Sequence, residues 1–109
     1  ALGDLWLVDL EPKLVPEQAG LIPAIVVSVD PLNHGPAGLV ILLPLTTRAK
    51  GVPSHVPIRP PEGGVRQASY IKCEDVRSVS KERLSQRWGA VSPATLAAVE
   101  ERLRLLLGL

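Results

Sequence analysis

Two short polar stretches of the sequence contain side chains that could carry out chemistry. Thr46, Thr47 and Arg48 follow an apolar run, and two hydroxyls beside a guanidinium form a combination that binds phosphate. Lys72 and Glu74 end a second apolar stretch, where a cation and a carboxylate could orient a hydroxyl and transfer a proton. Both stretches also fit a purely structural interpretation, because polar residues are typical of exposed turns and a solvated ion pair contributes only about 0–1 kcal/mol.

Other kinds of site have less support in the sequence. His34, His55 and Cys73 are scattered and lack the spacing of a zinc site, so we expect no metal. Gly63 and Gly64 lie in a proline-rich turn with no helix after it, so we expect no phosphate loop and no cofactor. His55 is either a surface or hydrogen-bonded histidine, or a group that contacts a ligand.

Length and composition restrict the class of protein. A chain of 109 residues has room for one domain, residues 1–109. Twelve basic and eleven acidic residues give a net charge of +1, so nucleic acid would have to bind to a local patch. The single cysteine, Cys73, suits a reducing compartment, and the sequence shows neither a membrane-spanning run nor a signal peptide. We therefore expect a soluble, cytoplasmic protein.

The elements that must position these side chains are short. Eleven prolines and nine glycines divide the chain into apolar segments that favour β-strands. The predicted strands begin near Leu5 and then cover residues 23–29, 39–45, 55–58 and 68–73, the last continued by 76–79. The run from Leu39 to Leu45 is apolar without alternation, which predicts a central strand covered on both faces.

One helix is predicted at the end of the sequence. Ser92 and Pro93 have the residue types that begin a helix, and Gly108 has the type that ends one. Its predicted apolar stripe consists of Leu96, Val99, Leu103, Leu106 and Leu107. Short strands followed by one amphipathic helix favour a small, partly open antiparallel barrel over a parallel sheet, which would need a helix between successive strands. The turn formers in residues 30–36 predict a loop.

The order of these segments resembles the MazF/PemK (Kid) family of toxin–antitoxin ribonucleases over nearly the whole chain. The matching stretches are GDLWLVDL (residues 3–10), EQAG followed by PAIVVS (17–28), PLTTR (44–48), SHV (54–56) and SYIKCEDVRSV (69–79). The resemblance implies a mainly β protein, an SH3-like, CcdB/MazF-type antiparallel barrel that forms a homodimer. It also implies a metal-independent, sequence-specific endoribonuclease, an mRNA interferase. Such a toxin would cleave single-stranded mRNA by attack of the 2′-hydroxyl and so inhibit translation and growth. The partner it implies is a cognate antitoxin with an acidic C-terminal tail.

The resemblance also assigns roles to particular residues. The catalytic residues that it implies are Thr46, Glu74, Lys72 and Arg48. The RNA-binding residues that it implies are Glu17, Gln18, Thr47 and His55. Without the resemblance, Glu17 and Gln18 would be interpreted as residues that cap or fix a loop.

One position departs from the family pattern. Where family members carry an arginine before the proline of the second strand, this sequence has Ile22. Loss of one preorganised donor to an oxyanion typically costs about 3–4 kcal/mol of barrier. Three explanations remain open: Lys72 or Arg48 supplies the charge, the chain is an inactivated form, or it binds RNA and antitoxin without cutting. A further alternative is a gyrase-directed, CcdB-like module, since the two groups share the barrel.

Overall fold

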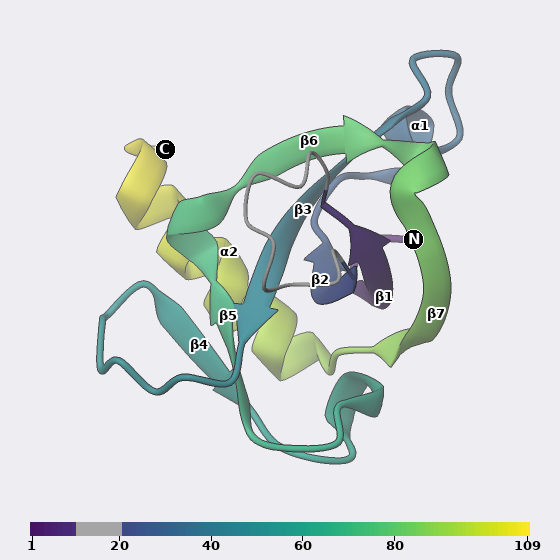
Figure 1. The fold of residues 1–109 in the computed structure, drawn as a ribbon. Coiled ribbons are helices and arrows are strands. Elements are labelled where there is room, and N and C mark those ends of the chain that lie inside the picture. Colours follow the sequence, from purple (N-terminus) through teal and green to yellow (C-terminus); the bar gives the residue numbers. More distant parts are fainter. Residues whose placement is uncertain (11–20) are drawn as a thin grey trace.

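The computed structural model describes residues 1–10 and 21–109 as a curved, seven-stranded sheet with a helix against it (Figure 1). The strands are β1 (Asp4–Asp9), β2 (Leu21–Val26), β3 (Leu39–Thr46), β4 (His55–Ile58), β5 (Ser69–Lys72), β6 (Arg77–Ser80) and β7 (Leu84–Ala90). The α-helices are α1 (Asp30–Asn33) and α2 (Pro93–Leu107), and single 3-10 turns form η1 (Glu62–Gly64), η2 (Cys73–Asp75) and η3 (Lys81–Arg83).

The strands form one antiparallel arrangement around β3. Along the sheet the order is β4-β5-β3-β2-β1-β7, and β6 also pairs with β3. On one edge of β3, β6 pairs with residues 39–42 and β5 with residues 45 and 46, while β2 pairs on the other edge. Because β6 and β7 curve around β1 and β2, the sheet closes into the partly open barrel that the sequence predicts (Figure 1).

Strand β3 is buried on both faces, as its unbroken apolar run predicts. Leu43 and Leu45 belong to the larger core cluster, which also contains Val99 of α2. Val40 and Leu42 point to the other face and pack in a second cluster around β1 and β2. Side chains alternate between the faces of a strand, so a strand with a core on each side has no polar positions to alternate with.

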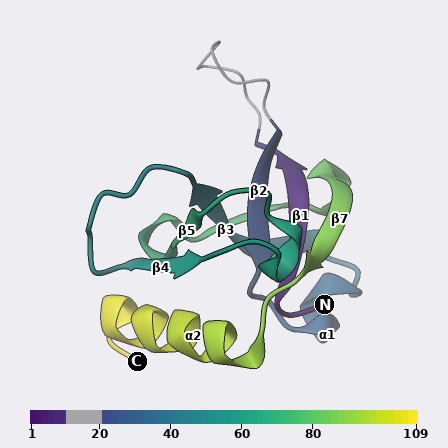
Figure 2. The same cartoon turned by 90° about the horizontal axis from the view of Figure 1, so that it is seen from below.

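Helix α2 begins and ends where the sequence predicts. The Ser92 hydroxyl accepts a hydrogen bond from the Thr95 N–H at 3.1 Å, Pro93 occupies the first turn, and Gly108 ends the helix with a φ of 71°. Glu62 of η1 also accepts the Ser92 N–H, at 2.9 Å. The helix packs against β4 and η2 and lies to one side of the sheet (Figure 2). Within the described residues, no helix has the length and hydrophobicity needed to cross a membrane.

The predicted apolar stripe of α2 holds for only part of its length. Val99 is fully buried and Leu103 packs against the core, but Leu106 and Leu107 are 47% and 55% exposed. A period of 3.6 residues identifies the face that is apolar, but it does not show where the neighbouring sheet ends. The last turn of the helix therefore presents leucines to the surroundings.

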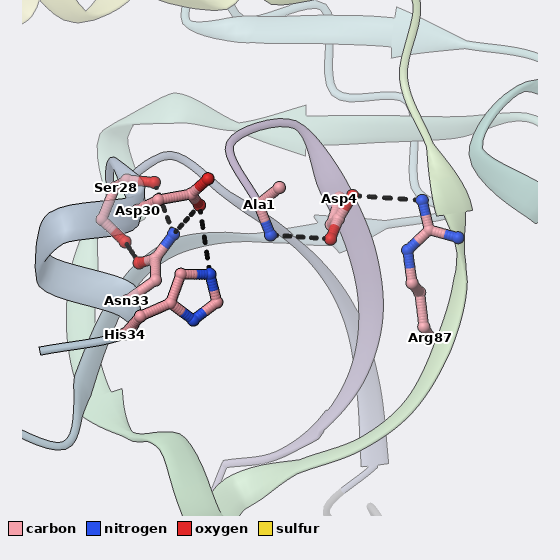
Figure 3. Close-up of polar contacts among 7 residues, drawn as sticks. All are labelled: Ala1, Asp4, Ser28, Asp30, Asn33, His34 and Arg87. Carbon is pink, nitrogen blue, oxygen red and sulfur yellow. Dashed lines mark hydrogen bonds and ion pairs between the residues drawn. The ribbon is translucent and has the colours of Figure 1, made fainter.

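The segment after β2 differs from the predicted loop, because α1 forms one helical turn there. The Asn33 amide donates to the Ser28 carbonyl at 2.9 Å, and the Ser28 hydroxyl donates to Asn33 Oδ1 (Figure 3). The Ser28 hydroxyl also accepts the Ile41 N–H at 3.0 Å. These bonds take Ser28 out of the strand predicted for residues 23–29, so β2 ends at Val26. The same bonds connect α1 to β3. Elsewhere in the sheet, Arg87 of β7 forms an ion pair with Asp4 of β1 at 3.1 Å (Figure 3).

Candidate functional site

The two polar stretches singled out in the sequence lie on neighbouring strands. The last residues of β3 pair with β5, Leu45 opposite Ile71 and Thr46 opposite Tyr70. Lys72 ends β5, and Glu74 follows in η2. The structure therefore brings the end of β3 and the end of β5 together at one place in the sheet.

Strand register places several of these side chains on the same face. Directly opposed residues in antiparallel strands share a face, as do residues two apart in one strand. Thr46, its partner Tyr70, and Lys72 therefore share a face, and so does His55, the partner of Lys72 on β4. The residues between them point into the core, where Ile71 is fully buried. On the polar face Thr46, Tyr70 and Lys72 are partly exposed, whereas His55 is buried.

Thr46 and Arg48 are joined by a local hydrogen bond. The Thr46 hydroxyl oxygen accepts the Arg48 N–H at 3.2 Å. Because the hydroxyl acts there as an acceptor, its own hydrogen remains available to donate to a substrate. Thr47 and Arg48 are both exposed at the start of the loop that leads to β4. This loop is also tied near its other end, since Arg102 Nε of α2 donates to the Pro53 carbonyl at 2.8 Å.

Glu74 is held by two consecutive residues at the start of β4. The Ser54 hydroxyl donates to one carboxylate oxygen at 2.7 Å, and His55 Nε2 lies 3.1 Å from the other. Partial burial opposes ionisation of Glu74, but hydrogen bonds from Ser54, from its own backbone amide and from His55 outweigh this effect. They lower its pKa below the ordinary value of 4.5. Glu74 is therefore an ionised, oriented carboxylate at neutral pH.

The cations next to Glu74 are directed at a different acid. Lys72 Nζ lies 3.6 Å from Asp75 Oδ2, and Arg77 Nη2 donates to both carboxylate oxygens of Asp75 at 2.8 Å. The Lys72 side chain is about one-third exposed, so its ammonium group can also reach a ligand in the solvent. Burial raises the pKa of the Cys73 thiol to about 11, outweighing nearby Arg102, so Cys73 remains a protonated thiol in the core.

Ile22, which stands where the resemblance predicts an arginine, lies across from Thr46 on the neighbouring strand. Ala24 of β2 pairs with Pro44 of β3, and Ile22 and Thr46 are each two residues further toward the same end of the sheet. Ile22 therefore shares a face with Thr46. Glu17 and Gln18 lie outside the described residues.

Sequence patterns did not indicate every contact of this site. Ser54 is separated from Glu74 by 20 residues and is a common surface residue type, so no spacing points to it. His55, predicted to meet RNA, is 8% exposed, and its Nε2 atom contacts Glu74. Among residues 1–10 and 21–109, no group of His, Cys, Asp and Glu side chains has the arrangement of a metal site.

Comparison with known proteins identifies the family. The model of PemK-like, MazF-like toxins of type II toxin–antitoxin systems matches residues 1–107. The chain belongs to this family. The endoribonuclease MazF9 of Mycobacterium tuberculosis is 35% identical over 112 residues, which cover 98% of this chain and 95% of that relative. The endoribonuclease toxin MazF of Escherichia coli K12 is 31% identical, covering 98% of this chain and 93% of that toxin.

Solved structures of PemK/MazF toxins have the same fold. The crystal structure of MazF from Deinococcus radiodurans matches with a TM-score of 0.82 and 30% identity, over 99% of this chain and 96% of that one. A structure of the MazE–MazF complex from the same organism matches with a TM-score of 0.83 and 30% identity, over 98% of this chain and 94% of that one. These comparisons confirm the predicted family and the predicted barrel with its C-terminal helix.

Proposed function

We propose that this PemK/MazF-family chain is a cytoplasmic toxin that cuts single-stranded mRNA, as an endoribonuclease with sequence preference, and so stops translation and growth. The observation that supports this function best is the common face formed by Thr46, Lys72 and Ile22, with Glu74 at the end of the same strand pair. A hydroxyl, a cation and an ionised carboxylate are the groups needed to cleave a phosphodiester next to a ribose 2′-hydroxyl.

In this mechanism the RNA supplies its own nucleophile. The Glu74 carboxylate, whose lowered pKa keeps it ionised, accepts the proton of the 2′-hydroxyl as the oxygen attacks phosphorus. The new O2′–P bond forms and the bond from phosphorus to the 5′-oxygen breaks, which leaves a cyclic phosphate and a 5′-hydroxyl. The Thr46 hydroxyl donates to a phosphate oxygen as negative charge develops there. Lys72 and Arg48 supply positive charge, and Lys72 or water returns a proton to the leaving oxygen.

RNA binding outside the reacting phosphate involves the loops that border this face. Thr47 and Arg48 are exposed at the start of the loop after β3, where they can bind a neighbouring phosphate. Glu17 and Gln18 remain RNA-binding candidates through the family resemblance. His55 contributes through Glu74, because its ring is buried and its Nε2 faces that carboxylate.

Two protein partners complete the proposal. One is a cognate antitoxin with an acidic C-terminal tail, which would occupy the basic RNA-binding face. The solved mycobacterial endoribonuclease in complex with its cognate antitoxin, 25% identical with a TM-score of 0.81, supports this partner. The other partner is a second copy of the chain. Leu105, Leu106, Leu107 and Leu109 are exposed at the end of α2, and a two-fold interface would cover them.

An RNA cleavage assay tests the proposed activity. The purified chain is incubated with a long unstructured RNA and EDTA, beside a Glu74→Gln variant prepared in the same way. We expect cleavage at a limited set of sites, and products that end in a cyclic phosphate. Intact RNA at every protein concentration would refute the activity. Equal cleavage by Glu74→Gln would point to a contaminating nuclease. Inhibition of DNA supercoiling by gyrase, with RNA left intact, would favour the CcdB-like alternative instead.

A further inference from the structure

Glu74 differs from the other acids near the site in how it is held. Each of its carboxylate oxygens has a separate partner, Ser54 at 2.7 Å and His55 at 3.1 Å, and these two residues are adjacent in the chain. Ser54 and His55 approach from the start of β4, whereas Glu74 belongs to η2 after β5. Because Ser54, in the turn before β4, and His55, the first residue of β4, each bond one carboxylate oxygen, the carboxylate cannot rotate freely.

His55 is buried and contacts Glu74 from the interior of the protein. The side chain of His55 is only 5% exposed, whereas that of Glu74 is 41% exposed. An ionised carboxylate can only accept hydrogen bonds, so the His55 Nε2 atom carries the hydrogen directed at Glu74. The other ring nitrogen, Nδ1, is buried without a hydrogen-bond partner among the described residues. A buried polar atom left unpaired is a cost to folding.

The cations Lys72, Arg77 and Arg102 on the neighbouring elements are paired with groups other than the Glu74 carboxylate. The elements next to Glu74 in the chain, and helix α2 packed on η2, carry the charged residues Lys72 (β5), Asp75 (η2), Arg77 (β6) and Glu100, Glu101, Arg102 and Arg104 (α2). Lys72 and Arg77 both direct their charge to Asp75. Arg102 contacts Glu101 and the Pro53 carbonyl. In the described part of the chain, the hydrogen bonds that reach the Glu74 carboxylate from other residues come from Ser54 and His55.

We propose that Ser54 and His55 are positioning residues for Glu74, which hold its carboxylate in the orientation and ionised state required of the base in RNA cleavage. This inference rests on the proposed function, since it concerns how the same site works. Neither residue needs to touch RNA, and they extend the site from β5 to the edge strand of the sheet, β4. His55 would therefore influence cleavage through Glu74, although its own side chain is buried.

Two measurements on matched variants test the proposal. The first is the pH dependence of kcat/KM for RNA cleavage. The second is the titration of the Glu74 carboxyl carbon by NMR, assigned with Glu74→Gln. The variants are Ser54→Ala, His55→Leu and His55→Gln, because glutamine places an amide donor where His55 Nε2 lies and does not titrate. His34→Gln and Ser78→Ala are the controls. Both residues are exposed, and they lie on other elements: His34 at the end of α1 and Ser78 in β6.

We expect Ser54→Ala and His55→Leu to shift both the Glu74 titration and the acid limb of kcat/KM to higher pH. His55→Gln should keep both near the unmodified values, as should the two controls. A loss of rate that is equal at every pH, with the Glu74 titration unmoved, would overturn the proposal in favour of a structural role. If His55→Leu does not fold, Ser54→Ala and His55→Gln still decide it.

The two measurements also separate this inference from the proposed function. If the unmodified chain does not cut RNA but the Glu74 titration shifts in Ser54→Ala, the hold on the carboxylate stands and the proposed activity fails. If the chain cuts RNA and neither the titration nor the acid limb moves, the proposed activity stands and the positioning role fails.

Discussion

Ile22 on β2 and Thr46 on β3 lie on the same face of the sheet, each two residues beyond the paired residues Ala24 and Pro44. An arginine at position 22 would therefore extend beside the Thr46 hydroxyl. We predict that Ile22→Arg increases RNA cleavage by about 10²–10³-fold, because a preorganised donor to a developing oxyanion is worth that much in rate. The measurement is kcat/KM on a short single-stranded RNA.

The neighbouring residue provides the control for added charge. Leu21 is 48% exposed and precedes Ile22 in β2, so its side chain points to the opposite face. Leu21→Arg adds the same charge at nearly the same place without facing Thr46. An equal increase in both variants would mean that general attraction of RNA, not the position beside Thr46, is responsible. If the unmodified chain already cleaves RNA, no increase in Ile22→Arg would mean that Lys72 or Arg48 supplies the charge.

The hydroxyl of Thr46 gives a second prediction. Thr46→Val keeps the shape of the side chain and its β-branched preference for strands, but removes the donor. We expect kcat/KM to fall about 10²-fold while the thermal unfolding temperature changes little. Thr46→Ser should retain most of the activity. Activity in Thr46→Val close to that of the unmodified chain would remove Thr46 from the mechanism.

The contact between η1 and α2 predicts a pH-dependent contribution to stability. Partial burial opposes ionisation of Glu62, but hydrogen bonds from Thr95 and Ser92 outweigh it and lower its pKa below the ordinary value of 4.5. The contribution is therefore present above about pH 4.5 and is lost as the pH falls through the lower, folded-state pKa. Glu62→Gln should lower the free energy of unfolding by about 1 kcal/mol at pH 7.

Urea unfolding of both proteins at pH 7 and at strongly acid pH checks this expectation. The difference in unfolding free energy between the unmodified chain and Glu62→Gln should shrink at acid pH, because Glu62 is then protonated and no longer the better acceptor. A difference that is independent of pH would show that the carboxylate charge is not what stabilises the start of α2.

The leucines at the end of α2 predict the assembly state. Leu105 and Leu109 are 75% and 83% exposed, which is unusual for two large apolar side chains that lie close together. We expect sedimentation at micromolar concentration to show a dimer, and the double variant Leu105→Glu, Leu109→Glu to shift it to monomer. Ala97→Glu, at an exposed position earlier on α2, is the control and should remain dimeric. A monomeric unmodified chain would contradict the prediction.

The fold could be predicted from the sequence wherever one local signal was sufficient. The apolar run of β3 and the Ser-Pro start and glycine end of α2 all lie where their patterns indicate. The predictions that failed depend on which segments pack against each other, and a local sequence pattern does not show this. The periodicity of α2 continues past the sheet that should cover it, so Leu106 and Leu107 are exposed. The turn formers at residues 30–36 gave no sign of the helical turn that Asn33 and Ser28 stabilise.

The spatial grouping of the candidate residues was predictable to a similar extent. Residues at the ends of β3 and β5 could be expected to meet once the strands were taken as neighbours, and the structure brings Thr46 and Lys72 to one face. Which acid pairs with which cation could not be predicted. Lys72, Glu74 and Asp75 are so close in sequence that only the conformation of η2 directs Lys72 to Asp75 and leaves Glu74 to β4.

The bond from Arg102 to the Pro53 carbonyl connects two parts of the molecule that have different tasks. The helix whose last turn would contact a second copy of the chain also fixes the loop between β3 and β4, on which Arg48 is exposed. Anything that displaces this helix, such as a fusion at its end or an antibody against its leucines, would release the loop from a distance. Inhibitors of such a toxin could therefore act at the helix end and leave the face that carries Thr46 and Lys72 untouched.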